Sequence, residues 1–308
     1  MIVRPQANWL RMLFIWDGSV LKEIVPQLLL ILAVSTLALE TDGSIGGIKI
    51  PLDTAPFPLV GVSLAIFLGF RNNAAYARFV EARHLWGRIL VATRNLTSQA
   101  GTYLPADGAQ AQAVRRLLVQ RLIAFTYALK HQLRGTDPAA DLARYLDAAE
   151  LAQVAGLQHI PVALLDQVRA QLGQAARSQT DGAALAWMFD GQVNELAADL
   201  AGCERIANTP IPYPYGVLIH RTVYLYCFLL PFGLVDAIGA ATPLISVFVA
   251  YTLFALEAIA QEISEPFGTA PNCLALDAMT RGVERSLREQ CGDALPAAIA
   301  PCKRYFVR

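Results

Sequence analysis

The chain has 308 residues, of which 55% are hydrophobic and 16% charged, and its formal net charge at pH 7 is +0. Soluble domains carry roughly 25% charged residues, so this composition favours a membrane protein. A net charge of zero gives no support to nucleic-acid binding, which usually depends on a clustered basic excess.

Two apolar segments lie in the first part of the chain. After an N-terminal segment (1–23), the first apolar segment (24–39) is followed by Glu40, which indicates a retained span and not a cleaved leader. The second segment covers 55–70. Spanning the hydrocarbon takes about 20 residues, so polar residues facing a protein interior or a water-filled pore would have to complete these short spans. Four buried helices in a soluble bundle are the alternative.

The second segment contains an apolar stripe. Val62, Ile66 and Phe70 are spaced by four residues, so they share one face of a helix, while small residues (Gly61, Ser63, Ala65, Gly69) lie on the other faces. Small residues let neighbouring helices approach closely in membranes. Several such helices around an axis would place the stripe in a lumen and form a gate that expels water. A stripe that faces lipid or the protein core is the alternative.

Residues 71–214 are rich in charge and predict a helical domain in the aqueous phase. Apolar residues at three- and four-residue spacing predict five helices, with Asp137 as the cap of the third. Residues 208–214 contain three prolines, so they predict a non-helical return to the membrane. The five predicted helices are 85–103, 109–134, 137–155, 161–177 and 181–206.

Two further apolar segments fall in residues 215–262. The first (222–235) belongs to a helix that begins near Tyr215, and the second covers 238–256. A polar segment (263–308) with a helix at 277–290 follows. Three acids near the end of the last span are interpreted as packing partners of the arginines at 71–83, with an ion site as the alternative; they are Glu257, Glu262 and Glu265.

Basic residues are distributed unevenly among the loops. Only Lys49 is basic between the first two spans, and the loop between the last two has no Lys or Arg, whereas residues 71–94 contain five arginines. The positive-inside rule therefore predicts that both termini and residues 71–214 are cytoplasmic.

Signals for catalysis are absent from the sequence. It contains no phosphate-binding glycine loop, no GxSxG, no HExxH and no paired Cys/His spacing, and its five cysteines include no CxxC pair. We therefore expect no enzyme, no cofactor and no metal site.

Three sequence motifs resemble the bestrophin family, in particular its bacterial homologues. They are residues 67–87 (FLGFRNNAAYARFVEARHLWG), residues 203–212 (CERIANTPIP) with 220–226 (HRTVYLY), and residues 262–268 (EISEPFG). The resemblance implies an all-α integral membrane protein, with four transmembrane helices per subunit and a cytoplasmic helical domain, assembled as a homopentamer in the bacterial inner membrane. It also implies a pore neck at Val62, Ile66 and Phe70 and a second constriction at the cytosolic exit, matched to Thr180. A simple N-cap pair of Thr180 and Asp181 is the alternative there.

The resemblance to bacterial homologues implies passage of monovalent cations, with sodium as the expected ion. Animal bestrophins pass anions and carry an acidic run after Pro-Phe-Gly that helps to bind calcium, whereas residues 269–273 here (TAPNC) contain no acid. We therefore expect no calcium gating. The alternatives are an anion (chloride) channel of the same fold and a non-conducting membrane scaffold or receptor. A transporter is less favoured, because no segment is repeated.

Overall fold

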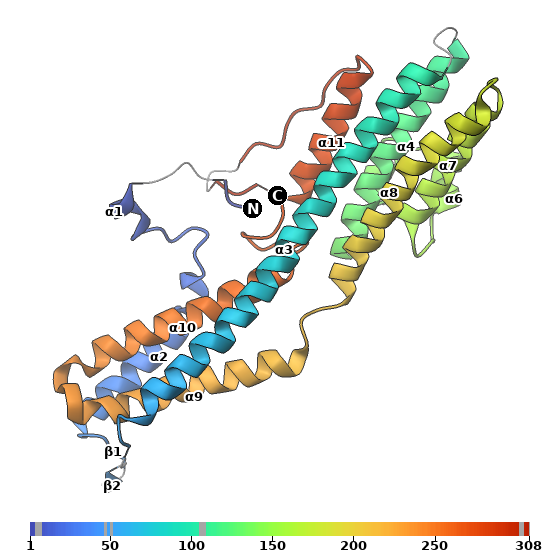
Figure 1. Cartoon of the computed structure of the whole chain (residues 1–308). Coiled ribbons are helices and arrows are strands. Elements are labelled where there is room, and N and C mark those ends of the chain that lie inside the picture. Colours follow the sequence, from blue (N-terminus) through green and yellow to red (C-terminus); the bar gives the residue numbers. More distant parts are fainter. Residues whose placement is uncertain (4–7, 46–47, 50–51, 105–108, 302–304, 308) are drawn as a thin grey trace. The chain divides into compact units, whose positions relative to one another are not determined.

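The computed structural model of the chain describes residues 1–3, 8–45, 48–49, 52–104, 109–301 and 305–307. Contacts between Cα atoms divide the chain into two units. We call Arg4–Phe79 with Pro210–Pro266 the apolar unit, and Met1–Val3 with Val80–Thr209 and Phe267–Arg308 the polar unit. Helix α3 (Pro56–Tyr103), labelled in Figure 1, contributes residues to both. The boundary predicted at residue 70, between the second span and the aqueous domain, falls inside this same helix. The position along α3 at which it leaves the membrane stays a prediction.

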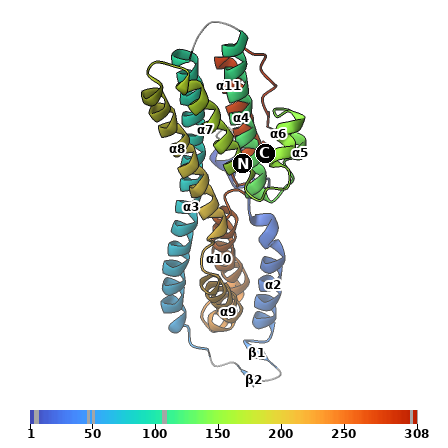
Figure 2. The ribbon, with the colours of Figure 1, turned by 90° about the vertical axis from the view of Figure 1, so that its right-hand side faces the viewer.

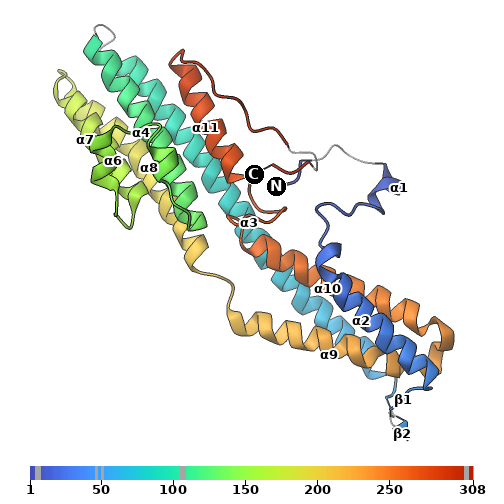
Figure 3. The ribbon, with the colours of Figure 1, turned by 180° about the vertical axis from the view of Figure 1, so that it is seen from behind.

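The apolar unit is built from helices that pack side by side (Figure 3). It contains α1 (Trp9–Met12), α2 (Leu21–Glu40), the first part of α3, α9 (Tyr213–Ile238) and α10 (Thr242–Ser264). A 3-10 helix, η1 (Gly239–Ala241), joins α9 to α10. One core is formed where α2, α3, α9 and α10 meet, with Ile31, Leu68, Val223 and Ala250 among its fully buried members. The four predicted apolar segments thus lie in four packed helices.

Three helical stretches of the chain are long and apolar enough to cross a membrane. They are Leu21–Glu40, Pro56–Tyr103 and Tyr213–Ser264, and only a minority of the residues in the most apolar part of each, at most 33%, are buried in the single chain. The third stretch contains both α9 and α10, so the third and fourth predicted spans form one long apolar stretch with a 3-10 turn inside it. An exposed apolar surface of this extent is what a hydrocarbon environment covers.

Four hydroxyl groups on the apolar helices are satisfied within their own helix. The side chains of Thr36, Ser63, Thr222 and Thr252 each donate to the carbonyl four residues earlier, at 2.8 to 3.1 Å. Because no water is available in hydrocarbon, such back-bonding lets a hydroxyl lie on a lipid-facing surface without an unpaired donor.

A short hairpin follows α2 and departs from the predicted all-helical fold. Strands β1 (Ser44–Ile45) and β2 (Ile48–Lys49) pair antiparallel, with Ser44 opposite Lys49. Gly43 precedes the hairpin with a positive φ of 72°, and Lys49 forms an exposed ion pair with Asp236 at 2.8 Å. The hairpin is a two-stranded sheet of four residues, so the fold class remains helical.

The polar unit is a bundle in which α4 contacts α7 and α11, and α7 contacts α8 (Figure 2). Its helices confirm four of the five predicted for residues 71–214, and they confirm the helix predicted at 277–290. The predicted non-helical return at 208–214 is confirmed only for residues 209–212, because α8 ends at Asn208 and α9 begins at Tyr213. Pro214 lies in the first turn of α9, where proline is tolerated. The bounds are α4 (Ala109–Arg134), α5 (Ala139–Leu142), α6 (Ala148–Val154), α7 (Ile160–Arg177), α8 (Gly182–Asn208) and α11 (Leu276–Gln290).

The predicted helix 137–155 is wrong, because the chain forms two short helices there, α5 and α6. A capping box begins α6: the Asp147 carboxylate accepts from the Glu150 amide at 2.8 Å, and the Glu150 side chain accepts from the Asp147 amide at 3.3 Å. These reciprocal bonds satisfy the first donors of a new helix and fix an extended residue at 147. The Asp137 side chain accepts from the Ala139 amide at 2.9 Å, but the N-cap residue of α5 is Pro138, so the prediction that Asp137 is the cap is wrong.

Candidate ion-conduction site

Helix α3 has two distinct faces within the apolar unit. Leu64 and Leu68 are buried in the core that α3 shares with residues of α2, α9 and α10. Val62, Ile66 and Phe70 lie on the opposite side and are 59%, 51% and 63% exposed in the single chain. The stripe is therefore not part of the core of its own unit, which excludes the core-facing alternative.

The small residues of α3 differ in what they contact. A Cβ added to Gly61 would lie 3.0 Å from the Tyr226 hydroxyl, so this glycine allows α9 to come close to α3. A Cβ added to Gly69 would meet nothing within 4 Å. Of these two glycines, Gly61 thus has the predicted role within one chain, and Gly69 leaves its surface open for an outside partner.

Arg71, the first charged residue after the stripe, is buried inside the protein. The Arg71 guanidinium lies 3.5 Å from the Glu257 carboxylate and donates to the Gln261 side chain at 2.7 Å. A ring nitrogen of His220 lies 2.8 Å from the same Glu257 oxygen. The predicted pairing between an acid of the last span and the arginines at 71–83 is confirmed for Arg71 and Glu257. Ionisable groups in apolar surroundings pair in this way, because isolated charges are costly there.

Thr180 lies in the exposed turn between α7 and α8, in the polar unit. Asp181 is the N-cap residue of α8, and its side chain makes no capping hydrogen bond. The predicted N-cap pair of Thr180 and Asp181 therefore does not form, and the Thr180 side chain is exposed. The stripe and Thr180 belong to different units, so each is a separate candidate position.

The turn at Thr180 depends on Gly182, and we expect Gly182→Ala to destabilise it. A Cβ at this position would lie 2.5 Å from the Ala176 carbonyl oxygen, which belongs to the backbone and cannot rotate away. Strain of this kind costs about 1–3 kcal/mol. Gly191→Ala in the same helix is the matched control, because its Cβ would meet nothing within 4 Å. Thermal unfolding should show a lower midpoint for Gly182→Ala alone. Equal midpoints would contradict the close approach.

A buried acid joins α8 to α3 near the middle of the polar unit. The Asp199 side chain is almost fully buried, and its carboxylate lies 3.0 Å from the Arg88 guanidinium. Arg88 also bonds Glu195 at 2.6 Å. Burial raises the pKa of Asp199 to about 6, Arg88 opposes that increase, and the charge of Glu195 adds to it.

This raised pKa predicts a pH-dependent effect of Asp199→Asn. The unfolded carboxyl titrates near pH 3.9, so native stability falls as pH rises from about 4 to 6. Asparagine resembles the protonated acid, so the variant should gain about 1–2 kcal/mol above pH 6 and nothing near pH 4. Unfolding midpoints across this range test it, with the exposed Asp166→Asn as control. A gain in stability for Asp199→Asn that does not vary with pH would contradict the raised pKa of Asp199.

Groups suited to metal binding are not found together in the described part of the chain. No cluster of three or more His, Cys, Asp or Glu side chains occurs among those residues. Asp277 pairs instead with Arg134 at 2.8 Å and with Lys130 at 3.1 Å. Asp277, the first acid after Pro-Phe-Gly, is thus paired with two cations.

An exposed apolar stripe on a membrane-type helix, beside a core that contains a paired charge, is an arrangement typical of a membrane channel subunit. Residues 1–289 match the family described as Bacterial/Fungal Bestrophin protein, and the chain belongs to this family.

Relatives support the same classification. The "Voltage-dependent anion channel-forming protein RSc3414" of Ralstonia nicotianae is 46% identical over 297 residues, which cover 95% of each chain. The "Voltage-dependent anion channel-forming protein YneE" of Escherichia coli K12 is 42% identical over 308 residues, which cover 99% of each chain. The crystal structure of a bacterial bestrophin homologue from Klebsiella pneumoniae superposes with a TM-score of 0.83 at 41% identity, covering 88% of this chain and 99% of that one. The resemblance found in the sequence is confirmed, as is the prediction that the chain is a channel-family protein and not an enzyme.

Proposed function

We propose that the chain forms a passive membrane channel for monovalent ions, with its narrowest part at Val62, Ile66 and Phe70. The observation that carries this proposal is the exposure of the stripe on the face of α3 opposite to the core. Residues 56–70 contain no charge. A lumen lined by such residues opposes ions by excluding water, and it opens when the ring widens or becomes wet.

The proposed assembly has five copies of the chain around one axis, in the bacterial inner membrane, with α2, α3, α9 and α10 as the four spans. The open surface at Gly69 and the exposed apolar side chains of α3 suit contacts between neighbouring subunits. The arginines that follow the second span support a cytoplasmic location for both termini and residues 71–214. Thr180 would present a hydroxyl at the cytosolic exit and make it easier to wet. Native mass spectrometry of the purified protein tests the number of subunits.

For the permeant ion, the names of the relatives favour the anion alternative over the sodium implied by the family resemblance. The neck itself favours neither cations nor anions, because its residues are uncharged and Arg71 is neutralised by Glu257. Selectivity must then depend on residues outside the stripe, since an apolar ring excludes both signs of charge by the same dewetting.

The reversal potential of the purified protein in planar bilayers under a NaCl gradient tests the proposal. A value near the chloride equilibrium potential supports the anion channel that the relatives' names describe. One near the sodium equilibrium potential supports the cation channel. The absence of current from folded, oligomeric protein would favour the scaffold and overturn the channel proposal.

A further inference from the structure

Two adjoining pockets lie between α4 and α11 in the polar unit. One has a volume of about 290 Å³ and the other of about 340 Å³, and they share Arg116 and Val119 in their walls. Three arginines line the first pocket: Arg116, Arg144 and Arg288. Asp293 is the one acidic residue in its wall among those described, and Asp141 and Glu284 behind the wall pair with Arg144 and Arg288. Arg115 adds a further positive charge in the second pocket.

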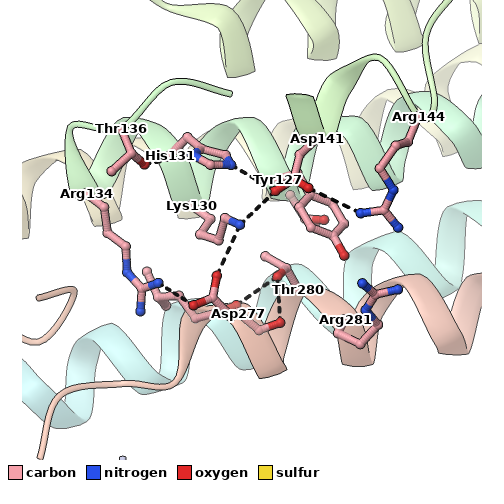
Figure 4. A network of polar contacts seen from close by, with 12 residues as sticks. Tyr127, Lys130, His131, Arg134, Thr136, Asp141, Arg144, Asp277, Thr280 and Arg281 are labelled. Carbon is pink, nitrogen blue, oxygen red and sulfur yellow. Dashed lines mark hydrogen bonds and ion pairs between the residues drawn. The ribbon is translucent and has the colours of Figure 1, made fainter. Parts of the chain in front are cut away.

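Two of these guanidinium groups are held in place. Arg144 lies over the Tyr145 ring, 5.0 Å from its centre. It also bonds Asp141 at 3.2 Å (Figure 4). Arg288 lies 3.1 Å from the Glu284 carboxylate beneath it. Stacking and pairing reduce the side-chain entropy that these arginines would lose on binding a ligand, so their positions are preorganised.

The remaining arginine of the first pocket, Arg116, is available to a ligand. Its side chain is exposed and makes no hydrogen bond or ion pair with any residue that the structure describes. The Tyr145 hydroxyl, in contrast, is fully enclosed beside Tyr127 and is not accessible from the pocket. The guanidinium groups are therefore the groups that would bind an anion here.

We propose that this pocket, the Arg116–Arg144–Arg288 site, binds the phosphoryl group of a small anionic metabolite. The planar fork of arginine matches phosphate oxygens with two parallel hydrogen bonds, and three such groups suit a dianion better than a monocarboxylate. A chloride ion would fill only a small part of a pocket of about 290 Å³. The adjoining pocket, which continues past Arg115 and Arg116, has room for the rest of a phosphate ester.

Binding of inorganic pyrophosphate to the purified oligomer, measured by calorimetry at fixed ionic strength, tests the site. Arg116→Gln removes the unpaired cation without breaking a contact, so the variant should fold. The lost charge-assisted bonds should weaken binding by about tenfold or more. Arg177→Gln is the matched control, because the Arg177 side chain is also exposed and makes no hydrogen bond or ion pair with any residue that the structure describes. Arg177 ends α7 and lies outside the pocket. Arg116→Lys should fall between the wild type and Arg116→Gln, because it keeps the charge and loses the fork.

The calorimetric results either support or overturn the proposed Arg116–Arg144–Arg288 site. Pyrophosphate binding that Arg116→Gln weakens and Arg177→Gln leaves unchanged supports the site. Wild-type protein that does not bind pyrophosphate overturns it, and so does equal weakening, or none, in both variants. A parallel titration with adenosine diphosphate identifies the source of the phosphoryl group: tighter binding than pyrophosphate indicates an ester that uses the second pocket, and weaker binding indicates a free phosphate. The measurement does not depend on ion conduction.

Discussion

Replacing Ile66 or Phe70 by alanine is expected to raise the single-channel current. Each substitution removes apolar side-chain volume from the stripe, which widens the proposed neck and lowers the free energy of wetting it. A barrier lowered by about 1.4 kcal/mol would increase the rate of ion passage roughly tenfold. Single-channel recording in planar bilayers measures this directly, with protein whose oligomeric state has been checked.

The chain offers closely matched controls on another helix. Phe248 and Ile245 lie on α10 and are 65% and 41% exposed, similar to Phe70 and Ile66 on α3. Phe248→Ala and Ile245→Ala remove the same atoms from an exposed apolar surface outside the stripe. We expect their currents to equal that of the wild type. If all four variants behave alike, the stripe faces lipid and the neck lies elsewhere.

Removing the carboxylate of Glu284 is expected to destabilise the polar unit more than any other substitution considered above. Glu284 is fully buried on α11, and the Tyr127 hydroxyl donates to it at 2.9 Å. Arg281 and Arg288 lie 3.0 and 3.1 Å from its oxygens, and Arg144 lies at 3.8 Å. Figure 4 shows Tyr127, Arg144 and Arg281 of this network. Without the acid, three cations would lie close together, and of the acids that the structure describes only Asp141, beside Arg144, would remain within bonding distance of them.

The expected cost of Glu284→Ala is about 3 kcal/mol, the lower end for breaking a buried pair, because the arginines are partly exposed and can recover water. The unfolding midpoint should then fall by on the order of 6–12 °C. Glu289→Ala, an exposed position on the same helix, should leave it unchanged. Glu284→Gln keeps an acceptor for Tyr127 and should fall between the two. A midpoint for Glu284→Ala equal to that of the Glu289 control would show that the network contributes little to stability.

Hydropathy and periodicity predicted the helices well, because both depend on residues close in sequence. The apolar segments at 24–39, 55–70, 222–235 and 238–256 all lie within helices of the apolar unit. The break in the predicted helix 137–155, between α5 and α6, could also have been predicted. Asp147 and Glu150 have the spacing of a capping box, which marks a helix start in the sequence itself. The periodicity of the surrounding alanines and leucines concealed it.

The polar contacts could be predicted only in part, since their partners lie far apart in the chain. The pairing of Arg71 with Glu257 followed from the cost of a lone charge among apolar helices. The participation of Gln261 and His220 depends on how α9 and α10 are rotated, which spacing does not determine. Similarly, α11 is amphipathic in sequence, but nothing near Glu284 indicates that Tyr127 and Arg144 would meet it.

Helix α3 places strict limits on where the length of this chain can change. It carries Phe70 of the stripe, Arg88, which pairs with Glu195 and Asp199 on α8, and Arg94, which bonds Ser286 on α11 at 2.6 Å. One residue inserted between Phe70 and Arg88 would rotate every later side chain of the helix by about 100° and break both sets of bonds. Insertions and deletions in homologous genes should therefore be excluded from α3 and collect in connecting segments such as residues 291–301.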